Sequence, residues 1–282
     1  MIRGTTRLVG LLGHPVVHSL SPAMHNSAME YLGIDMCYVA FDVDPADLER
    51  ALDGLRSMNA VGTNITIPHK EAVSRWVDEL DPAAEKSGAV NTVVFGRNGS
   101  KGYNTDIIGV KRTLSGLAPA RGKAMVLGAG GAARGVLCAL LEEEFERIFI
   151  ANRTRSKAEA LAEELSSFAK RPVVEILPWG TFPDGGADLL VNATSLGLGV
   201  NTWPKDILER AVMSSSKGKI IDMVYSPDGR TPLTSEASGR GIPCSGGEEV
   251  LLGQGIAAFE LFTGEEAPVE IMRNVLCRGR RI

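Results

Sequence analysis

Short apolar runs and longer amphipathic segments follow one another along the first third of the chain. The apolar runs predict strands at residues 7–13, 36–43, 61–67 and 89–95. Apolar residues at helical spacing predict helices over residues 21–33 and 44–58, the first with Ser21 as its N-cap and Pro22 at the first helical position. This alternation is typical of an α/β domain with a mostly parallel sheet, which we expect to end near residue 106.

The same alternation resumes at residue 123 and continues almost to residue 247. Its segments predict the strands and helices of a doubly wound domain: residues 123–144, 147–165, 173–178, 187–195 and 218–225. From Gly247 the pattern changes to two helices without strands, over residues 247–264 and 268–276. Two such helices could pack on either block.

The composition is that of an ordinary globular protein. With 282 residues the chain is long enough for two domains with well-formed cores. Hydrophobic residues make up 44% and charged residues 23%, and the net charge of -4 gives no reason to expect nucleic acid or an anionic membrane as a partner. A small molecule is therefore the expected ligand.

The cysteines and the N-terminal segment bear on where the protein works. Cys37, Cys138, Cys244 and Cys277 lie far apart in apolar sequence with no CxxC spacing, which favours buried free thiols over a disulfide or a zinc site. The first residues lack the apolar stretch of a signal peptide, and no apolar run is long enough to span a membrane. We expect a protein of the reducing cytoplasm that holds no metal ion.

A glycine-rich turn joins the strand and the helix that open the second block. In "AMVLGAGGAARGV", Gly128, Gly130 and Ala133 fit the G-x-G-x-x-G/A dinucleotide pattern. A strand that turns tightly into a helix points backbone N–H groups and the positive end of the helix dipole at a pyrophosphate. A turn without a ligand is the alternative, but the strand before it and the helix after it favour a dinucleotide site.

The next strand ends in residues that distinguish the two nicotinamide cofactors. An NAD site carries Asp or Glu roughly 20 residues after the glycines, whereas this chain has Asn152, Arg153 and Thr154 there, with Lys157 one turn further on. A neutral residue followed by cations suits a 2′-phosphate, which Arg binds through paired hydrogen bonds. NADP(H) is therefore the predicted cofactor. The alternative is a solvated helix start made by Arg153, Arg155 and Lys157, although cations there oppose the helix dipole.

Small polar residues collect at the strand ends and helix starts of the first block. They are Ser19 and Ser21 after the first strand, Asn64 and Thr66 on one face of the third, Asn91 and Thr92 at the fourth, and Asn104, Thr105 and Asp106 at a helix start. Taken singly, each could be a cap or turn residue, and Asp106 in particular could be only an N-cap. Together they could hydrogen-bond a compact polyhydroxylated ligand.

Nearly the whole chain resembles the shikimate dehydrogenase family. The resemblance rests on the order and spacing of the stretches "GHPVVHSLSPAMHN", "NITIPHK", "GAVNT", "GYNTDIIG", "GAGGAARG", "NRT", "NATSLG", "DMVYSP", "TPL" and "GQGIAAFELFTG". It implies a reversible, NADPH-dependent reduction of 3-dehydroshikimate to shikimate in chorismate and aromatic amino acid biosynthesis. It also implies two α/β domains around a cleft, a substrate domain of residues 1–106 with 247–282 and a Rossmann-like NADP domain of residues 107–246. A monomer or a homodimer is expected.

The resemblance assigns roles residue by residue. Lys70 and Asp106 are the implied catalytic pair. The implied substrate-binding residues are Ser19, Ser21, Asn64, Thr66, Lys70, Asn91, Asp106, Tyr225 and Gln254. The implied cofactor-binding residues are Gly128, Ala129, Gly130, Gly131, Ala132, Asn152, Arg153, Thr154, Lys157, Met223 and Gly247. The chain departs from the family pattern at Glu248 and Glu249, which stand where apolar residues are usual.

The chemistry of the implied reaction gives the catalytic pair distinct roles. Hydride transfer to a carbonyl leaves an alkoxide that needs a proton, and a lysine ammonium can supply it. We expect Lys70 to donate that proton while Asp106 holds the lysine and the substrate hydroxyls. In the reverse direction either neutral Lys70 is the base, or it orients the substrate while water relays the proton. His69 is expected to be structural, because neighbouring side chains on an extended strand point to opposite faces.

Two other functions stay open. One is a quinate/shikimate dehydrogenase that prefers NAD, which the basic cofactor turn and the presence of both Ser19 and Ser21 disfavour. The other is a non-enzymatic metabolite sensor, against which the presence of both Lys70 and Asp106 argues.

Overall fold

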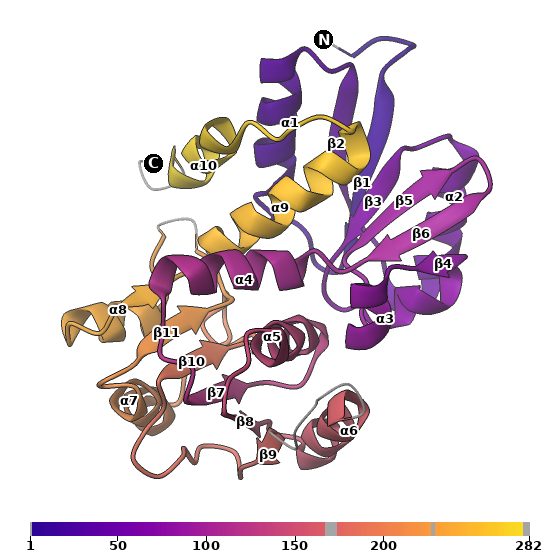
Figure 1. The fold of residues 1–282 in the computed structure, drawn as a ribbon. Coiled ribbons are helices and arrows are strands. Elements are labelled where there is room, and N and C mark those ends of the chain that lie inside the picture. Colours follow the sequence, from indigo (N-terminus) through magenta and orange to yellow (C-terminus); the bar gives the residue numbers. More distant parts are fainter. Residues whose placement is uncertain (1, 167–173, 227–228, 279–282) are drawn as a thin grey trace. The chain divides into compact units, whose positions relative to one another are not determined.

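The computed structural model describes residues 2–166, 174–226 and 229–278, which form two compact units (Figure 1). Unit 1 comprises Met1–Ile108 with Leu251–Ile282, and unit 2 comprises Gly109–Val250. The boundaries lie a few residues beyond positions 106 and 246, because the helices α4 (Asp106–Leu117) and α9 (Gly247–Thr263) each run from one unit into the other.

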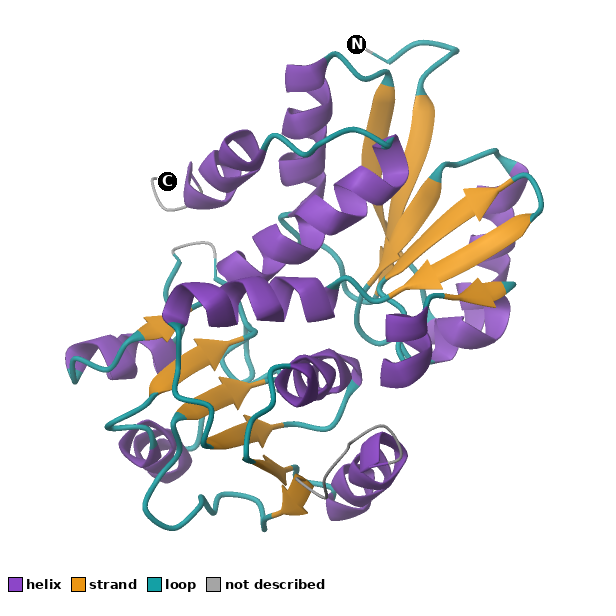
Figure 2. Ribbon diagram, viewed as in Figure 1, coloured by secondary structure: helices purple, strands orange, loops and turns teal. Residues whose placement is uncertain are grey.

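Unit 1 contains a mixed six-stranded sheet with the order β2-β1-β3-β5-β6-β4. Strands are drawn in orange in Figure 2, in the same view as the labelled Figure 1. Its strands are β1 (Arg7–Gly13), β2 (Met36–Asp42), β3 (Gly62–Ile65), β4 (Glu79–Leu80), β5 (Thr92–Gly96) and β6 (Gly99–Tyr103). Parallel pairs join β1 to β2 and β3, and β4 to β6, whereas β5 is antiparallel to both its neighbours. The β5–β6 hairpin is absent from the predicted elements, because its second strand, "GSKGY", has almost no apolar residues.

Helices cover both faces of the unit 1 sheet. The helices α1 (Ser21–Leu32), α9 and α10 (Val269–Arg278) share one core with β1 and β2, built around residues such as Met24, Tyr38, Phe259 and Met272. The elements η1 (Pro45–Asp47), α2 (Leu48–Ser57), η2 (Ala72–Trp76) and α3 (Pro82–Ser87) belong to the other face, whose core includes Leu52, Val73 and Ala84. One prediction is wrong: the N-cap of α1 is Leu20, and no side chain caps the helix, so Ser21 is already its first helical residue.

Unit 2 is a doubly wound domain with a fully parallel sheet of order β12-β11-β10-β7-β8-β9. Its strands are β7 (Lys123–Leu127), β8 (Arg147–Ala151), β9 (Val174–Ile176), β10 (Leu189–Asn192), β11 (Lys219–Asp222) and β12 (Cys244–Ser245). Its helices are α5 (Gly131–Glu142), α6 (Arg155–Ser166), α7 (Lys205–Ser214) and α8 (Pro232–Gly239). The chain winds outward from β7 in one direction and then from β10 in the other, so the topological switch point lies between these two strands. Residue 173, the first of a predicted strand, lies outside the described residues.

Three findings concern membrane spans, metal ligands and the cysteines. Within the described residues, no helix combines the length and apolar character needed to cross a membrane, and no cluster of three or more His, Cys, Asp or Glu side chains could hold a metal ion. The four cysteines form no disulfide with one another, and Cys138 alone among them is fully buried. Cys277 is exposed because it follows Leu276, which together with Met272 forms the buried face of α10.

Candidate active site and cofactor site

One edge of the unit 1 sheet brings together polar residues that are far apart in the sequence. The strands β1, β3 and β6 end at this edge, and β5 begins there because it runs antiparallel to β3 and β6. In this register Asn64 of β3 lies opposite Thr92 of β5, which lies opposite Tyr103 of β6. Several side chains at these strand ends therefore form hydrogen bonds with one another.

A lysine–carboxylate pair lies at the centre of this edge. Lys70 Nζ donates to Asp106 Oδ2 at 2.5 Å, and the two side chains are only 15% and 6% exposed. Asn91 Nδ2 donates to the other carboxylate oxygen at 2.9 Å, so both oxygens of Asp106 have donors. The carboxylate also stands at the N-terminus of α4, where the helix dipole favours negative charge. Asp106 is thus more than an N-cap, and it is Asn104 Oδ1 that accepts its backbone N–H.

Asn91 is the hub of the hydrogen bonds around this pair. Its Oδ1 accepts from the backbone N–H of Thr105 at 2.8 Å and from the hydroxyl of Thr92 at 3.0 Å. Its Nδ2 also contacts Gln254 Oε1 of α9 at 3.4 Å. Two predicted residues separated by more than half of the chain therefore lie in one network, which fixes the orientation of the Asp106 carboxylate.

Asn64 is held on the other side of this network. The hydroxyl of Tyr38 donates to Asn64 Oδ1 at 2.8 Å, and Asn64 Nδ2 donates to the carbonyl of Asn91 at 3.1 Å and to the hydroxyl of Thr92 at 2.9 Å. Both amide hydrogens are therefore engaged, and only Oδ1 keeps a lone pair for a ligand. Sequence reasoning missed Tyr38. The sequence did contain a signal for it, a tyrosine within an otherwise apolar strand. A buried Tyr usually finds a hydrogen-bond partner for its hydroxyl.

The remaining predicted substrate residues of unit 1 lie on the segments after β1 and β3. Ser19 Oγ accepts the backbone N–H of Ser21 at 3.3 Å, and Ser21 is buried at the start of α1. The backbone N–H of Thr66 bonds the carbonyl of Leu12 at 2.9 Å, which ties the end of β3 to β1. His69 is buried and its Nε2 lies 2.8 Å from the carbonyl oxygen of Val43. It follows the end of β3 at Ile65, so the extended strand on which its structural role was predicted does not reach it.

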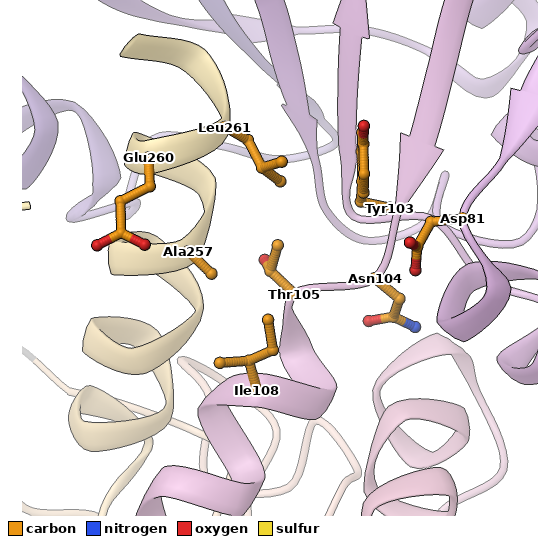
Figure 3. A pocket seen from close by; sticks show the side chains of 8 residues that line it. All are labelled: Asp81, Tyr103, Asn104, Thr105, Ile108, Ala257, Glu260 and Leu261. Carbon is orange, nitrogen blue, oxygen red and sulfur yellow. The ribbon is translucent and has the colours of Figure 1, made fainter. Parts of the chain in front are cut away.

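A pocket borders this network at Thr105 (Figure 3). It lies between α9 and the segment that joins β6 to α4, and its lining residues are Asp81, Tyr103, Asn104, Thr105, Ile108, Ala257, Glu260 and Leu261. Neither Lys70 nor Asp106 lines it. The pocket is therefore separate from the catalytic pair, and the hydrogen-bonded edge of the sheet defines the candidate active site.

The glycine turn of unit 2 exposes backbone rather than side chains. Gly128 has a φ of +112°, and a Cβ there would lie 2.8 Å from the carbonyl oxygen of Ala193. Gly130 is the N-cap of α5, no side chain caps the helix, and its first turn contains no acidic residue. The N–H groups of this first turn, which belong to Gly131, Ala132 and Ala133, have no partner within the helix. Such a turn, with Ala129 between its glycines, fits a dinucleotide pyrophosphate.

The end of β8 carries the predicted 2′-phosphate residues. Asn152 Nδ2 donates to the carbonyl of Thr154 at 2.9 Å, which shapes the turn into α6. The side chains of Arg153 and Lys157 are exposed at this turn. Arg155 instead pairs with Glu159 on its own helix at 2.8 Å. For this residue the structure supports the alternative prediction, a solvated helix start.

The segment after β11 brings together two further predicted cofactor residues. The backbone N–H of Gly247 bonds the carbonyl of Val224 at 3.1 Å, and a Cβ at Gly247 would lie 2.4 Å from the carbonyl oxygen of Met223. Glycine at 247 is thus required by close packing. Tyr225 follows and is half-buried in unit 2, and Glu248 lies in the first turn of α9.

The doubly wound unit with its glycine turn and the buried lysine–aspartate pair define an oxidoreductase of the nicotinamide-dependent class. Family models match three stretches of the chain: the shikimate dehydrogenase substrate binding domain at residues 11–93, shikimate/quinate 5-dehydrogenase at 111–177, and the shikimate 5′-dehydrogenase C-terminal domain at 247–277. The chain belongs to the shikimate dehydrogenase family, as its sequence motifs predict.

Individual relatives agree over nearly the full length. The NADP(+) shikimate dehydrogenase of Methanopyrus kandleri is 46% identical over 98% of this chain and 97% of its own. A crystal structure of a shikimate dehydrogenase in complex with NADP+ has a TM-score of 0.88 at 36% identity, covering 99% of this chain and 97% of the other. The quinate dehydrogenase of Corynebacterium glutamicum, solved with NAD, has a TM-score of 0.86 at 30% identity, covering 97% and 99%. The predicted two-domain α/β fold class is confirmed.

Proposed function

We propose that this protein is an NADP-dependent shikimate dehydrogenase that reversibly reduces 3-dehydroshikimate to shikimate. The observation that carries the proposal is the buried Lys70–Asp106 pair held by Asn91, in a chain whose relatives are named as NADP(+) enzymes. The reaction belongs to aromatic amino acid biosynthesis, and we place it in the cytoplasm. Unit 1 is assigned to the substrate and unit 2 to the cofactor, in a monomer or a homodimer.

In this proposal the edge of the unit 1 sheet binds the substrate. Lys70 donates a hydrogen bond and then a proton to the substrate oxygen, while Asp106 holds the ammonium and accepts from a substrate hydroxyl. Asn64 can accept a hydroxyl hydrogen only through Oδ1, because its amide hydrogens are engaged. The further proposed substrate residues are Ser19, Ser21, Thr66, Asn91, Gln254 and Tyr225.

The cofactor would lie on the C-terminal edge of the unit 2 sheet. The first-turn N–H groups of α5 would hold the pyrophosphate, and Arg153 and Lys157 the 2′-phosphate. Met223 and Gly247 would lie beside the nicotinamide. NADPH, when bound there, would supply the hydride for the reduction.

A four-way steady-state assay tests the function: shikimate or quinate, each with NADP+ or NAD+, followed by reduced-cofactor absorbance. The proposal expects the highest kcat/KM for shikimate with NADP+. Because a quinate dehydrogenase shares the fold, higher rates with quinate and NAD+ would establish that second function instead. Absence of turnover in all four combinations would favour a metabolite sensor.

A further inference from the structure

Asp222, the last residue of β11 in unit 2, has a buried carboxylate that takes no part in the proposed catalytic chemistry. Asp222 has no exposed side-chain surface. Its Oδ1 accepts from Asn192 Nδ2 at 2.8 Å and from the backbone N–H of Val224 at 3.1 Å, and its Oδ2 accepts from the hydroxyl of Thr231 at 2.5 Å. These donors come from the end of β10, the segment after β11 and the start of α8, so one side chain joins three segments.

The partners of Asp222 extend this network into the loop after β10. Asn192 Oδ1 accepts from the hydroxyl of Thr194 at 2.7 Å and from its backbone N–H at 3.1 Å, and Asn192 Nδ2 also donates to the carbonyl of Leu196. The backbone N–H of Met223 bonds the carbonyl of Asn192 at 2.9 Å. Thr231 in turn forms a capping box with Thr234 at the start of α8. The loop after β10 and the first residues after β11 therefore have one common anchor.

The sheet order indicates which half of a dinucleotide would meet these segments. The strand β7, which carries the glycine turn, lies between β8 on one side and β10 on the other. In a doubly wound sheet the dinucleotide crosses the switch point along the C-terminal edge. With the 2′-phosphate at Arg153 after β8, the nicotinamide half would extend over the ends of β10 and β11. Gly128 already packs against the carbonyl of Ala193 in the loop after β10.

We propose that Asp222 is a positioning residue for the nicotinamide half of the cofactor. It touches no reacting atom. It fixes the loop after β10 and the backbone of Met223, which would form the surface that the nicotinamide half meets. The inference rests on the proposed function, since it requires NADP(H) to bind unit 2.

The cost of burying this carboxylate supports a specific role. Burial raises the pKa of Asp222 to about 6, with a smaller contribution from the charge of Glu248, against three hydrogen bonds that lower it. The three donors are neutral, so within the described part of the chain no cation hydrogen-bonds Asp222 to compensate the lost hydration. An apolar residue would fill the site at lower cost but could not bind the three segments together.

Calorimetric binding of two ligands tests the inference. NADP+ carries both halves of the cofactor, whereas 2′,5′-ADP carries only the adenosine half. For Asp222→Ala we expect the Kd of NADP+ to rise at least about tenfold while that of 2′,5′-ADP stays within about twofold. Thr231→Val, which removes this donor together with the side-chain cap of α8, should show the same selective loss on a smaller scale, and Asp222→Asn should recover part of the affinity.

Two controls separate positioning from general damage. Arg153→Ala should weaken both ligands, because both carry the 2′-phosphate. Unchanged NADP+ affinity, or an equal loss of both ligands, in Asp222→Ala and Thr231→Val would overturn the inference. If Asp222→Ala does not fold, Thr231→Val decides alone. Failure of the wild-type protein to bind either ligand would refute the proposed cofactor itself, which is a distinct result.

Discussion

The candidate active site at the unit 1 sheet and the candidate cofactor site at the unit 2 sheet differ in the kind of group that would contact a ligand. At the edge in unit 1 the functional groups are side chains: an ammonium, a carboxylate and several amides in one hydrogen-bonded network. At the edge in unit 2 they are mainly backbone N–H groups exposed by the glycine turn before α5. Proton transfer needs a group that can change its charge, whereas a phosphate needs fixed donors. The difference follows from the chemistry that each unit is proposed to serve.

Each edge also contains a buried carboxylate, and the two are stabilised differently. Asp106 has a lysine partner at 2.5 Å, whereas Asp222 is held by neutral donors alone. A charged partner offsets desolvation more fully than neutral donors do. We therefore expect Asp106 to matter for the chemistry of the reaction and Asp222 for the geometry of the cofactor site.

The largest effect is expected when the side chain at the centre of the unit 1 edge is removed. Lys70→Ala should lower kcat by roughly 10² or more, because it deletes the proposed proton donor, while shikimate binding stays largely intact. Steady-state kinetics and calorimetry measure the two quantities. Lys205→Ala, an exposed position at the start of α7, is the matched control. Near-normal turnover of Lys70→Ala would remove Lys70 from the chemistry.

Unit 1 should lose stability in acid through His25. This ring stacks on Tyr38 at 4.5 Å, and complete burial lowers its pKa to about 3. The unfolded chain takes up a proton near pH 6.5, so the contribution is complete above that pH and is lost as the pH falls towards 3. Relative to His25→Phe, the wild-type free energy of unfolding should fall by about 3 kcal/mol between pH 7 and 4.5. Parallel pH curves for the two proteins would contradict this.

Unit 2 should respond in the opposite direction through Asp222. Because burial raises its pKa to about 6, the protonated carboxyl favours the folded state. That contribution is complete below the unfolded pKa and is lost as the pH rises through 6. Denaturant titrations should show the wild type gaining up to about 3 kcal/mol relative to Asp222→Asn between pH 7 and 4. A relative loss on acidification would reverse the assigned sign.

A smaller pair of effects should separate the two glycines of the cofactor turn. Gly128→Ala should cost about 1–3 kcal/mol of stability, because φ is +112° and the Cβ would approach the Ala193 carbonyl. Gly130→Ala, with a φ of -107° and no neighbouring atom near its Cβ, should cost less than about 1 kcal/mol yet weaken NADP+ binding. Urea unfolding and calorimetry distinguish them. Equal losses of stability and equal NADP+ affinities in the two variants would show that the turn only connects β7 to α5 and does not bind the cofactor.

Much of both edges could be predicted because the signals are local. A strand end, a glycine pattern and a helix start lie within a few residues of one another, so the sequence around Gly128 or Asp106 already indicates its surroundings. Proline and serine at the start of α1 predicted its position within one residue, although Leu20 proved to be the cap.

What could not be predicted depends on partners that are distant in sequence. The β5–β6 hairpin forms because β3 offers a pairing edge, and its own alternation is too weak to predict it. The hydrogen bond from Tyr38 to Asn64 and the three donors of Asp222 require the register of separate strands and the arrival of α8. Neither is visible in any single motif.

Backbone amide NMR with each ligand added alone tests most directly whether unit 1 binds the substrate and unit 2 the cofactor. Shikimate should shift signals around Lys70, Asn91 and Asp106, and NADP+ should shift those of residues 128–132 and 152–154. If shikimate instead shifted the unit 2 signals, or NADP+ the unit 1 signals, the assignment would be contradicted. Side chains of unit 1 would then not bind the substrate, or the backbone of unit 2 would not bind the cofactor.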